Sequence, residues 1–259
     1  MRGGIHTSQG PLKTPVGDRV CPPRTFIMKK NDIIFWTKEV GLPEIEPIKP
    51  SQYYIPQWFH NTPTWLDHQI SKIDNPTVKG CPGIADFFKM GFVIPLWCDL
   101  YIDVKDDGTW TWRTPHKRFY FESHDQWQFK DHLAEEVQQN IKIVLKAYCP
   151  WFAKTPKDVS LLQLPMSYHF DSRFSLMPGI IRTDVHHFIN QQLIIHNEGE
   201  TFIPRGTPLG MYVPIRQEKW NLILRDETPE DNKILDRLIL ALDSKFSKRY
   251  RNLTKSLDK

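Results

Sequence analysis

Two histidines and a carboxylate give the clearest candidate for chemistry in this sequence. His169 and Asp171 form a His-x-Asp pair, and His196 follows downstream. Two histidines and one carboxylate on one face are the ligand set of non-haem Fe(II) oxygenases, and Arg205 could grip the carboxylate of 2-oxoglutarate. However, Asp171 and His196 stand close together in the sequence, whereas those barrels place several strands between their ligands. Iron binding is therefore one interpretation, and histidines that serve only the fold or the surface are the other.

The elements that would position these side chains lie in and before residues 178–220. In this block Leu193 and Ile195 alternate with polar residues, which is typical of a strand with one buried face. The preceding residues 159–169 also have a strand pattern, and we expect them to pair with the block. Turn-forming residues separate the expected strands of the block, which are 179–183, 190–196 and 209–215.

The order of residues in this block resembles the dUTPase and dCTP-deaminase-like proteins, which have β-clip folds. The shared features are a Pro-Gly entering a strand, an acid soon after it, and an Asn after a β-segment. Residues 202–214, Phe-Ile-Pro-Arg-Gly-Thr-Pro-Leu-Gly-Met-Tyr-Val-Pro, resemble the closing Ile-x-x-Gly-Asp-x-Ile-x-Gln element. Arg182 stands where that family has an acid, and Thr207 replaces the aspartate of the closing element. The resemblance therefore implies a β-clip-like core without the family's activity.

Within such a core, a second candidate site consists of Arg182, Asp184 and Arg205. In a β-clip trimer these residues can lie at a subunit junction, where arginine side chains hold phosphate groups bidentately. Mg²⁺ would be the accompanying metal. An ion pair at the surface or between subunits is the alternative that we favour, because such pairs are common and need no ligand.

The first half of the chain predicts strands, loops and one short helix. The prolines of residues 27–54 favour edge strands and loops over helices there. Residues 82–90 predict a short helix that begins at a proline and ends at Gly91. Residues 92–104 predict one long strand, and its alternating apolar residues are expected to lie on one buried face. Asp-Asp-Gly at 106–108 predicts a hairpin turn into a returning strand with two tryptophans on one face.

Two longer helices are also expected. The latter part of residues 125–148 has helical spacing of its apolar side chains, which predicts a lateral helix. Residues 228–246 predict a C-terminal amphipathic helix with Thr228 as N-cap and Pro229 in the first turn. A basic tail follows this helix and is the expected contact with partner proteins, through Lys248, Arg249 and Arg251. We expect three segments: an extended arm at 1–24, one mainly β domain at 25–227, and the helix and tail at 228–259.

Tryptophans cluster with prolines in the first half of the chain. Such a cluster can form a stacking surface for carbohydrates or bases, but packing in the core or at an interface is the more ordinary explanation. The tryptophans concerned are Trp36, Trp58, Trp65, Trp97, Trp110, Trp112 and Trp127.

Composition argues against several classes of protein. Lys and Arg total 34 against 30 acidic residues, a net charge of +4 with the cations scattered, so nucleic acid is not an expected partner. No apolar run is long enough for a membrane helix, and the polar start is not a signal peptide. The four cysteines contain no Cys-x-x-Cys, which predicts reduced thiols without zinc. We expect a soluble chain in a virion or the host cytoplasm, and not a secreted one.

Several short motifs resemble an uncharacterised protein family of tailed phages and bacteria. The resemblance covers most of residues 50–220 and implies a phage or bacterial context with one continuous domain. The motifs include Ile55-Pro56-x-Trp58-Phe59, Lys79-Gly80-Cys81-Pro82, Gly91-Phe92-x-Ile94-Pro95-Leu96, Ser123-His124-x-x-Trp127 and Pro150-Trp151-x-x-Lys154-Thr155-Pro156.

Together these observations predict a mainly β (α+β) protein: a β-clip-like core of short strands, one lateral helix and a C-terminal amphipathic helix. The expected function is that of a non-catalytic structural protein of a tailed-phage particle, such as a decoration, connector or tail component. It would act through contacts with other particle proteins and with copies of itself, a trimer being one form, and would need no cofactor. The alternative is an enzyme, either a divergent dUTPase-like nucleotide hydrolase or a non-haem Fe(II)/2-oxoglutarate oxygenase.

Overall fold

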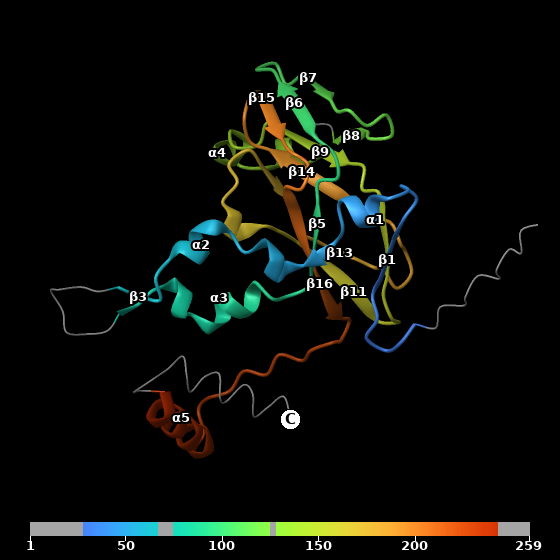
Figure 1. Ribbon diagram of the computed structural model, residues 1–259. Helices are drawn as coiled ribbons and strands as arrows, with labels where there is room; N and C mark the ends of the chain where they lie inside the picture. Colours follow the sequence, from blue (N-terminus) through green and yellow to red (C-terminus); the bar gives the residue numbers. More distant parts are fainter. Residues whose placement is uncertain (1–27, 67–74, 125–127, 243–259) are drawn as a thin grey trace, which may run out of the picture.

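The computed structural model describes residues 28–66, 75–124 and 128–242 (Figure 1). Strands dominate the described chain, so the prediction of a mainly β protein is confirmed. The expected N-terminal arm, residues 1–24, lies outside the described residues, as do Lys248, Arg249 and Arg251 of the basic tail. The α-helices are α1 (Leu42–Ile45), α2 (Gln57–Asn61), α3 (Pro82–Phe87), α4 (Glu135–Gln138) and α5 (Pro229–Leu242).

A five-stranded antiparallel sheet forms the centre of the β body, with the strand order β13-β11-β16-β5-β2. Strands β11 and β16 pair along their length, from Val159 opposite Arg216 to Pro165 opposite Gly210. The expected pairing of residues 159–169 with the 178–220 block is therefore confirmed. The bounds are β2 (Lys49–Pro50), β5 (Phe92–Pro95), β11 (Val159–Pro165), β13 (Gly179–Ile181) and β16 (Pro208–Arg216).

A four-stranded antiparallel sheet has the order β12-β14-β9-β8. The expected alternation on β14 is confirmed, because Leu193 and Ile195 are fully buried. The helix expected in the latter part of 125–148 is wrong, since β9 forms the end of that stretch and only the short α4 within it is α-helical. Val144 and Leu145 fit a helical stripe, but they fit a strand buried on both faces equally well. The bounds are β8 (Phe121–His124), β9 (Ile143–Ala147), β12 (Phe174–Leu176) and β14 (Gln191–Ile195).

A three-stranded sheet, β15-β6-β7, contains the expected hairpin. Val104 faces Trp110 across the turn, and Gly108 adopts a φ of 81° that favours glycine. The single strand expected at 92–104 is wrong, because it divides into β5 and β6, which belong to different sheets. The bounds are β6 (Leu100–Val104), β7 (Trp110–Arg113) and β15 (Gly199–Ile203). Two further sheets have two strands each. They are β1 (Ile34–Thr37) with β10 (Trp151–Lys154), and β3 (Trp65–Leu66) with β4 (Asn75–Pro76).

One hydrophobic core joins the three larger sheets. Leu161 of β11, Leu193 of β14 and Ile203 of β15 are fully buried members of the same cluster. Of the tryptophans in the first half of the chain, Trp97 is buried, and Trp110 and Trp112 pack against the core. For these three tryptophans the packing interpretation is therefore confirmed.

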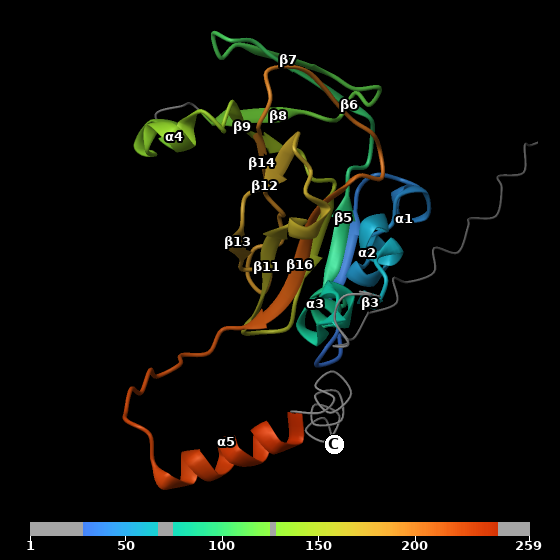
Figure 2. The same cartoon turned by 90° about the vertical axis from the view of Figure 1, so that its left-hand side faces the viewer.

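The chain leaves the β body at the end of β16 and runs as an extended segment to α5, which lies apart from the sheets (Figure 2). We call residues 217–242 the C-terminal arm. The hydroxyl of Thr228 donates a hydrogen bond of 2.7 Å to the Asp231 carboxylate, and the Asp231 N–H donates to that hydroxyl at 3.4 Å. The expected cap of this helix is thus confirmed. No helix in the described ranges has the length and apolar character that crossing a membrane requires.

Candidate functional site

The candidate phosphate-binding set, Arg182, Asp184 and Arg205, does not form a single cluster. Arg182 binds Asp184 through two hydrogen bonds of 3.0 Å, Nε to Oδ1 and Nη2 to Oδ2. These bonds are the largest cause that lowers the pKa of Asp184. Arg205 instead lies on the loop before β16, where its Nε is 3.6 Å from Glu46 Oε2. The bidentate face of Arg182 is therefore already filled by a neighbouring carboxylate.

The candidate metal-binding residues, His169, Asp171 and His196, are also held by other partners. His169 Nε2 lies 2.7 Å from the carbonyl oxygen of Tyr54. The Asp171 carboxylate accepts hydrogen bonds from Arg173, Nε to Oδ1 at 2.9 Å and Nη2 to Oδ2 at 2.6 Å.

His196 is bonded on both ring nitrogens. Its Nδ1 lies 2.8 Å from the carbonyl oxygen of Asn140, and its Nε2 lies 3.0 Å from Ser175 Oγ. Across the described ranges, no group of three or more His, Cys, Asp or Glu side chains is arranged to hold a metal ion.

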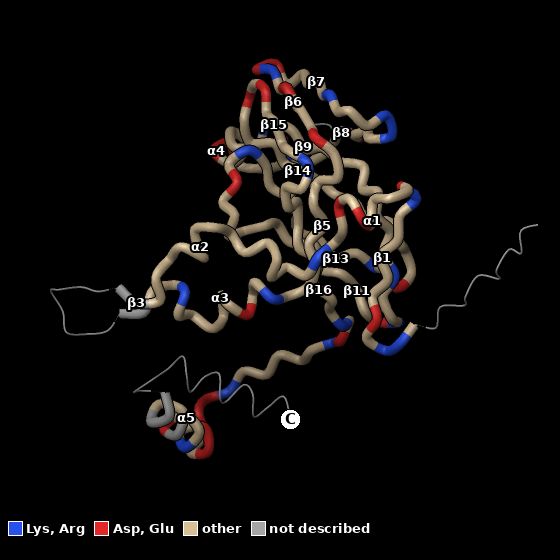
Figure 3. The backbone as a smooth tube through the Cα atoms, viewed as in Figure 1, with Lys and Arg blue, Asp and Glu red and all other residues tan. Residues whose placement is uncertain are grey.

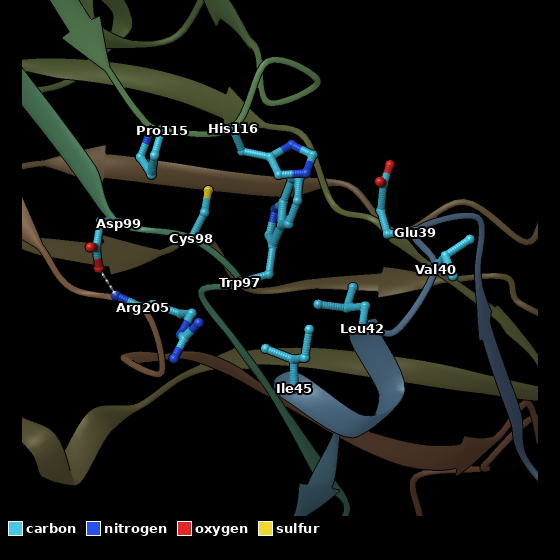
Figure 4. Close-up of a pocket in the computed structure, with 10 residues that line it drawn as sticks. All are labelled: Glu39, Val40, Leu42, Ile45, Trp97, Cys98, Asp99, Pro115, His116 and Arg205. Carbon is cyan, nitrogen blue, oxygen red and sulfur yellow. Dashed lines mark hydrogen bonds between the residues drawn. The ribbon is translucent and has the colours of Figure 1, made fainter.

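A hollow of about 580 Å³ in the β body lies beside α1 (Figure 4). Helix α1 follows Gly41, which has a φ of 80°, and carries Pro43 in its first turn. The expectation that this proline-rich stretch forms no helix is therefore wrong, because a first-turn proline loses no helical hydrogen bond. The hollow is lined by Glu39, Val40, Leu42, Ile45, Trp97, Cys98, Asp99, Pro115, His116 and Arg205.

The walls of this hollow combine apolar and polar surface in similar amounts. Val40 is completely exposed at 101% and Ile45 is 60% exposed, although both are large aliphatic residues. Trp97 is buried, and its ring centroid lies 4.3 Å from that of His116. Figure 4 shows the Trp97 indole in the middle of the wall, with its nitrogen on the edge toward Cys98. Among the described residues, that buried N–H has no hydrogen-bond acceptor, which is unusual for a buried polar group.

Carboxylates surround the apolar wall. Glu39 Oε2 lies 3.2 Å from Arg118 Nη1. On the opposite side, Asp99 Oδ1 accepts the backbone N–H of Arg205 at 2.8 Å, as the dashed line in Figure 4 shows. Together with Glu46 beside Arg205, these groups give the rim more acidic than basic side chains.

The thiol of Cys98 in this hollow has no feature of a nucleophile. Burial raises the pKa of Cys98, and the hydroxyl of Thr114 donates a hydrogen bond to its sulfur at 3.2 Å. Reactive cysteines have a lowered pKa and partial exposure. In this arrangement the Cys98 thiol is not activated as a nucleophile.

The C-terminal arm is the second prominent surface. Trp220, Leu222, Ile223 and Leu224 are all between 78% and 85% exposed. Figure 3 shows this stretch as uncharged, followed by basic and then acidic residues before α5. On α5 the aliphatic face predicted from the sequence is also uncovered, with Ile234, Leu235, Leu238 and Ile239 exposed.

Sequence reasoning missed both the hollow and the apolar run of the arm. The residues of the hollow come from four distant stretches of chain, so no local motif predicts that they lie together. The run at 220–224 did carry a signal, since four large apolar residues stand between Lys219 and Arg225 without a strand-like alternation.

No protein-family model matches this chain, and no curated protein sequence or solved structure matches it at a significant level.

Proposed function

We propose that this protein is a non-catalytic structural protein of a tailed-phage particle that works through protein–protein contacts. The observation that carries the proposal is the C-terminal arm, which extends from the β body with its apolar side chains exposed. Contiguous exposed apolar surface is typical of sites that bind other proteins.

The energetics of the arm support a partner. Burial of one large aliphatic or aromatic side chain contributes about 1.5–3 kcal/mol. The arm leaves Trp220, Leu222, Ile223 and Leu224 in water, together with the aliphatic face of α5. A contact that buries half of these side chains would contribute several times the burial free energy of one side chain. The cost of lost translational and rotational freedom is subtracted from this contribution.

The state of the candidate reactive groups also supports a role in binding. Asp171 and Asp184 are each held by a neighbouring arginine. The pKa values of Cys98 and Cys149 are raised by burial, which opposes formation of a thiolate. These groups stabilise the fold in the arrangement observed.

The particle setting rests on the resemblance to a tailed-phage family described above. In the structure, two of its motifs lie at the positions where strands and helices begin: Pro82 starts α3, and Phe92 starts β5. The oligomer, and the decoration, connector or tail position within a particle, belong to the same proposal.

Mass spectrometry of purified particles from the source phage tests this setting. The expected result is the chain at a fixed copy number relative to the major capsid protein, after washes that remove loosely bound host proteins. Its absence from washed particles, with the chain found only in the infected-cell lysate, would overturn the particle role.

A further inference from the structure

We propose that the apolar run of the C-terminal arm, residues 220–224, docks into the hollow beside α1 on a second copy of this chain. The inference rests on the proposed function, because it names the partner of the arm. It is carried by an exposed apolar segment and by a hollow at whose mouth two large aliphatic residues, Val40 and Ile45, are exposed.

The arm's tryptophan cannot reach the hollow of its own chain. The hollow lies beyond the start of β16, because two of its lining residues are placed there. Arg205 precedes β16, and Trp97 follows Pro95, which pairs with Pro208 at the start of that strand. Strand β16 has nine residues and spans about 30 Å. Trp220 lies only four residues past Arg216, a reach of at most about 14 Å. A Trp220 side chain that docks in the hollow must therefore come from another copy.

The apolar surfaces match in character and size. Val40 and Ile45 leave aliphatic surface exposed at the mouth, and Leu42 and Trp97 form the buried wall. A hollow of about 580 Å³ has room for an indole and a neighbouring aliphatic side chain. Burial of Trp220 would remove the largest exposed apolar side chain of the arm from water.

The backbone of the arm is also available to a partner. In the described chain, the peptide groups of residues 219–224 form no backbone hydrogen bond, since the last one before α5 is from Gln217 N–H to the Asp158 carbonyl. An extended segment of this kind offers free peptide groups to polar side chains at the mouth of the hollow.

Charge fits the same orientation. Lys219, directly before the apolar run, forms no ion pair among the described side chains and is exposed. The rim of the hollow carries Glu39, Asp99 and, beside Arg205, Glu46. Glu39 and Glu46 pair with Arg118 and Arg205, so a cation next to the docked segment would meet Asp99 as the carboxylate without an arginine side-chain partner.

Photo-crosslinking in the full chain tests the contact. A benzophenone amino acid replaces Trp220, and isotope-labelled and unlabelled copies are mixed before illumination. The expected product joins residue 220 of one copy to a peptide of the other that contains residues 39–45 or 97–99. Crosslinks that fall elsewhere on the β body, or only within one copy, would overturn the docking site.

A matched pair of substitutions separates this inference from the proposed function. Val40→Asp places a charge at the mouth of the hollow and is expected to raise the dissociation constant of the oligomer at least about tenfold. Val185→Asp is the control, because Val185 is also exposed, at 70%, and does not line the hollow. If Val40→Asp leaves assembly intact while charged arm variants abolish it, the proposed function stands and the docking site is wrong. A wild-type chain that is monomeric at every concentration overturns the docking site, whereas the particle role is overturned separately, by absence of the chain from washed particles.

Discussion

The amide of Gln191 donates a hydrogen bond of 3.0 Å from Nε2 to the hydroxyl of Tyr212, and both side chains are buried. The bond connects β14 of the four-stranded sheet to β16 of the five-stranded sheet. Burial raises the pKa of the Tyr212 hydroxyl well above its usual value, so it stays protonated. The two sheets are thus joined by a specific polar contact within the apolar core.

Tyr212→Phe should therefore lower the free energy of unfolding by about 1–3 kcal/mol, because the Gln191 amide loses its partner inside the core. Urea denaturation followed by circular dichroism measures the change. Tyr53→Phe is the control, since Tyr53 is 69% exposed and forms no such contact. Equal losses for the two variants would show that the bond contributes nothing specific.

Gly91 cannot carry a side chain in this fold. Its φ is 65°, and a Cβ placed there would overlap the carbonyl oxygen of Tyr212 on β16. Gly91→Ala should lower the free energy of unfolding by at least about 2 kcal/mol, because strain and steric overlap combine. Gly83→Ala is the matched control: Gly83 lies in α3 with open space around it, and alanine there should be neutral or stabilising by up to about 1 kcal/mol.

The Asp171–Arg173 pair should make stability depend on pH. Burial by itself would raise the pKa of Asp171, but the hydrogen bonds from Arg173 outweigh it, and the pKa is lowered. The stabilisation is present above the unfolded pKa, near 4, and is lost as the pH falls through the lower folded value. Asp171→Asn should therefore destabilise the protein at pH 7, and the difference from wild type should shrink as the pH falls below 4.

The control for this pH effect is Asp86→Asn, because Asp86 pairs with Lys89 only on the exposed surface at 3.7 Å. Thermal unfolding of the variants between pH 3 and 7 provides the measurement. A difference between Asp171→Asn and wild type that stays constant over this range would contradict the assigned role of the ion pair.

The described cysteines should differ in reactivity. Burial raises the pKa of Cys149 to about 12 and also raises that of Cys98, whereas Cys81 is exposed. In the native protein at pH 8, iodoacetamide should label Cys81 within minutes and reach the other two only after unfolding. Peptide mass spectrometry identifies the labelled sites.

The same thiols should make stability depend on pH. Because the pKa of each buried thiol is raised in the folded state, the free energy of unfolding should be level below pH 8.5 and decline as the pH rises above it.

The hairpin at Asp106-Asp107-Gly108 could be predicted because a local turn fixes it, and Gly108 supplies the positive φ. The start of α5 could be predicted for the same reason, since Thr228 and Asp231 cap it locally. Strand β9 could not, because its apolar run suits a helix or a buried strand. Its partners β8 and β14 decide the outcome, and β14 is distant in the chain.

The candidate sites show the same limit. Charged residues near each other in sequence, such as Arg182 and Asp184, pair with each other, and Arg205 joins a different surface. The hollow gathers Val40, Trp97 and Arg205 from three distant segments. Its exposed walls follow from how the sheets are arranged and not from any motif.

The central claim is that the C-terminal arm drives assembly, and size-exclusion chromatography with light scattering tests it most directly. The full chain is compared with a Leu222→Asp/Leu224→Asp variant and with Asn221→Asp, a control that adds charge to a polar position of the same exposed segment. The account predicts an oligomer for the wild type and the control, and a folded monomer for the double variant. A wild-type chain with the mass of a monomer, or a double variant that remains oligomeric, would contradict it.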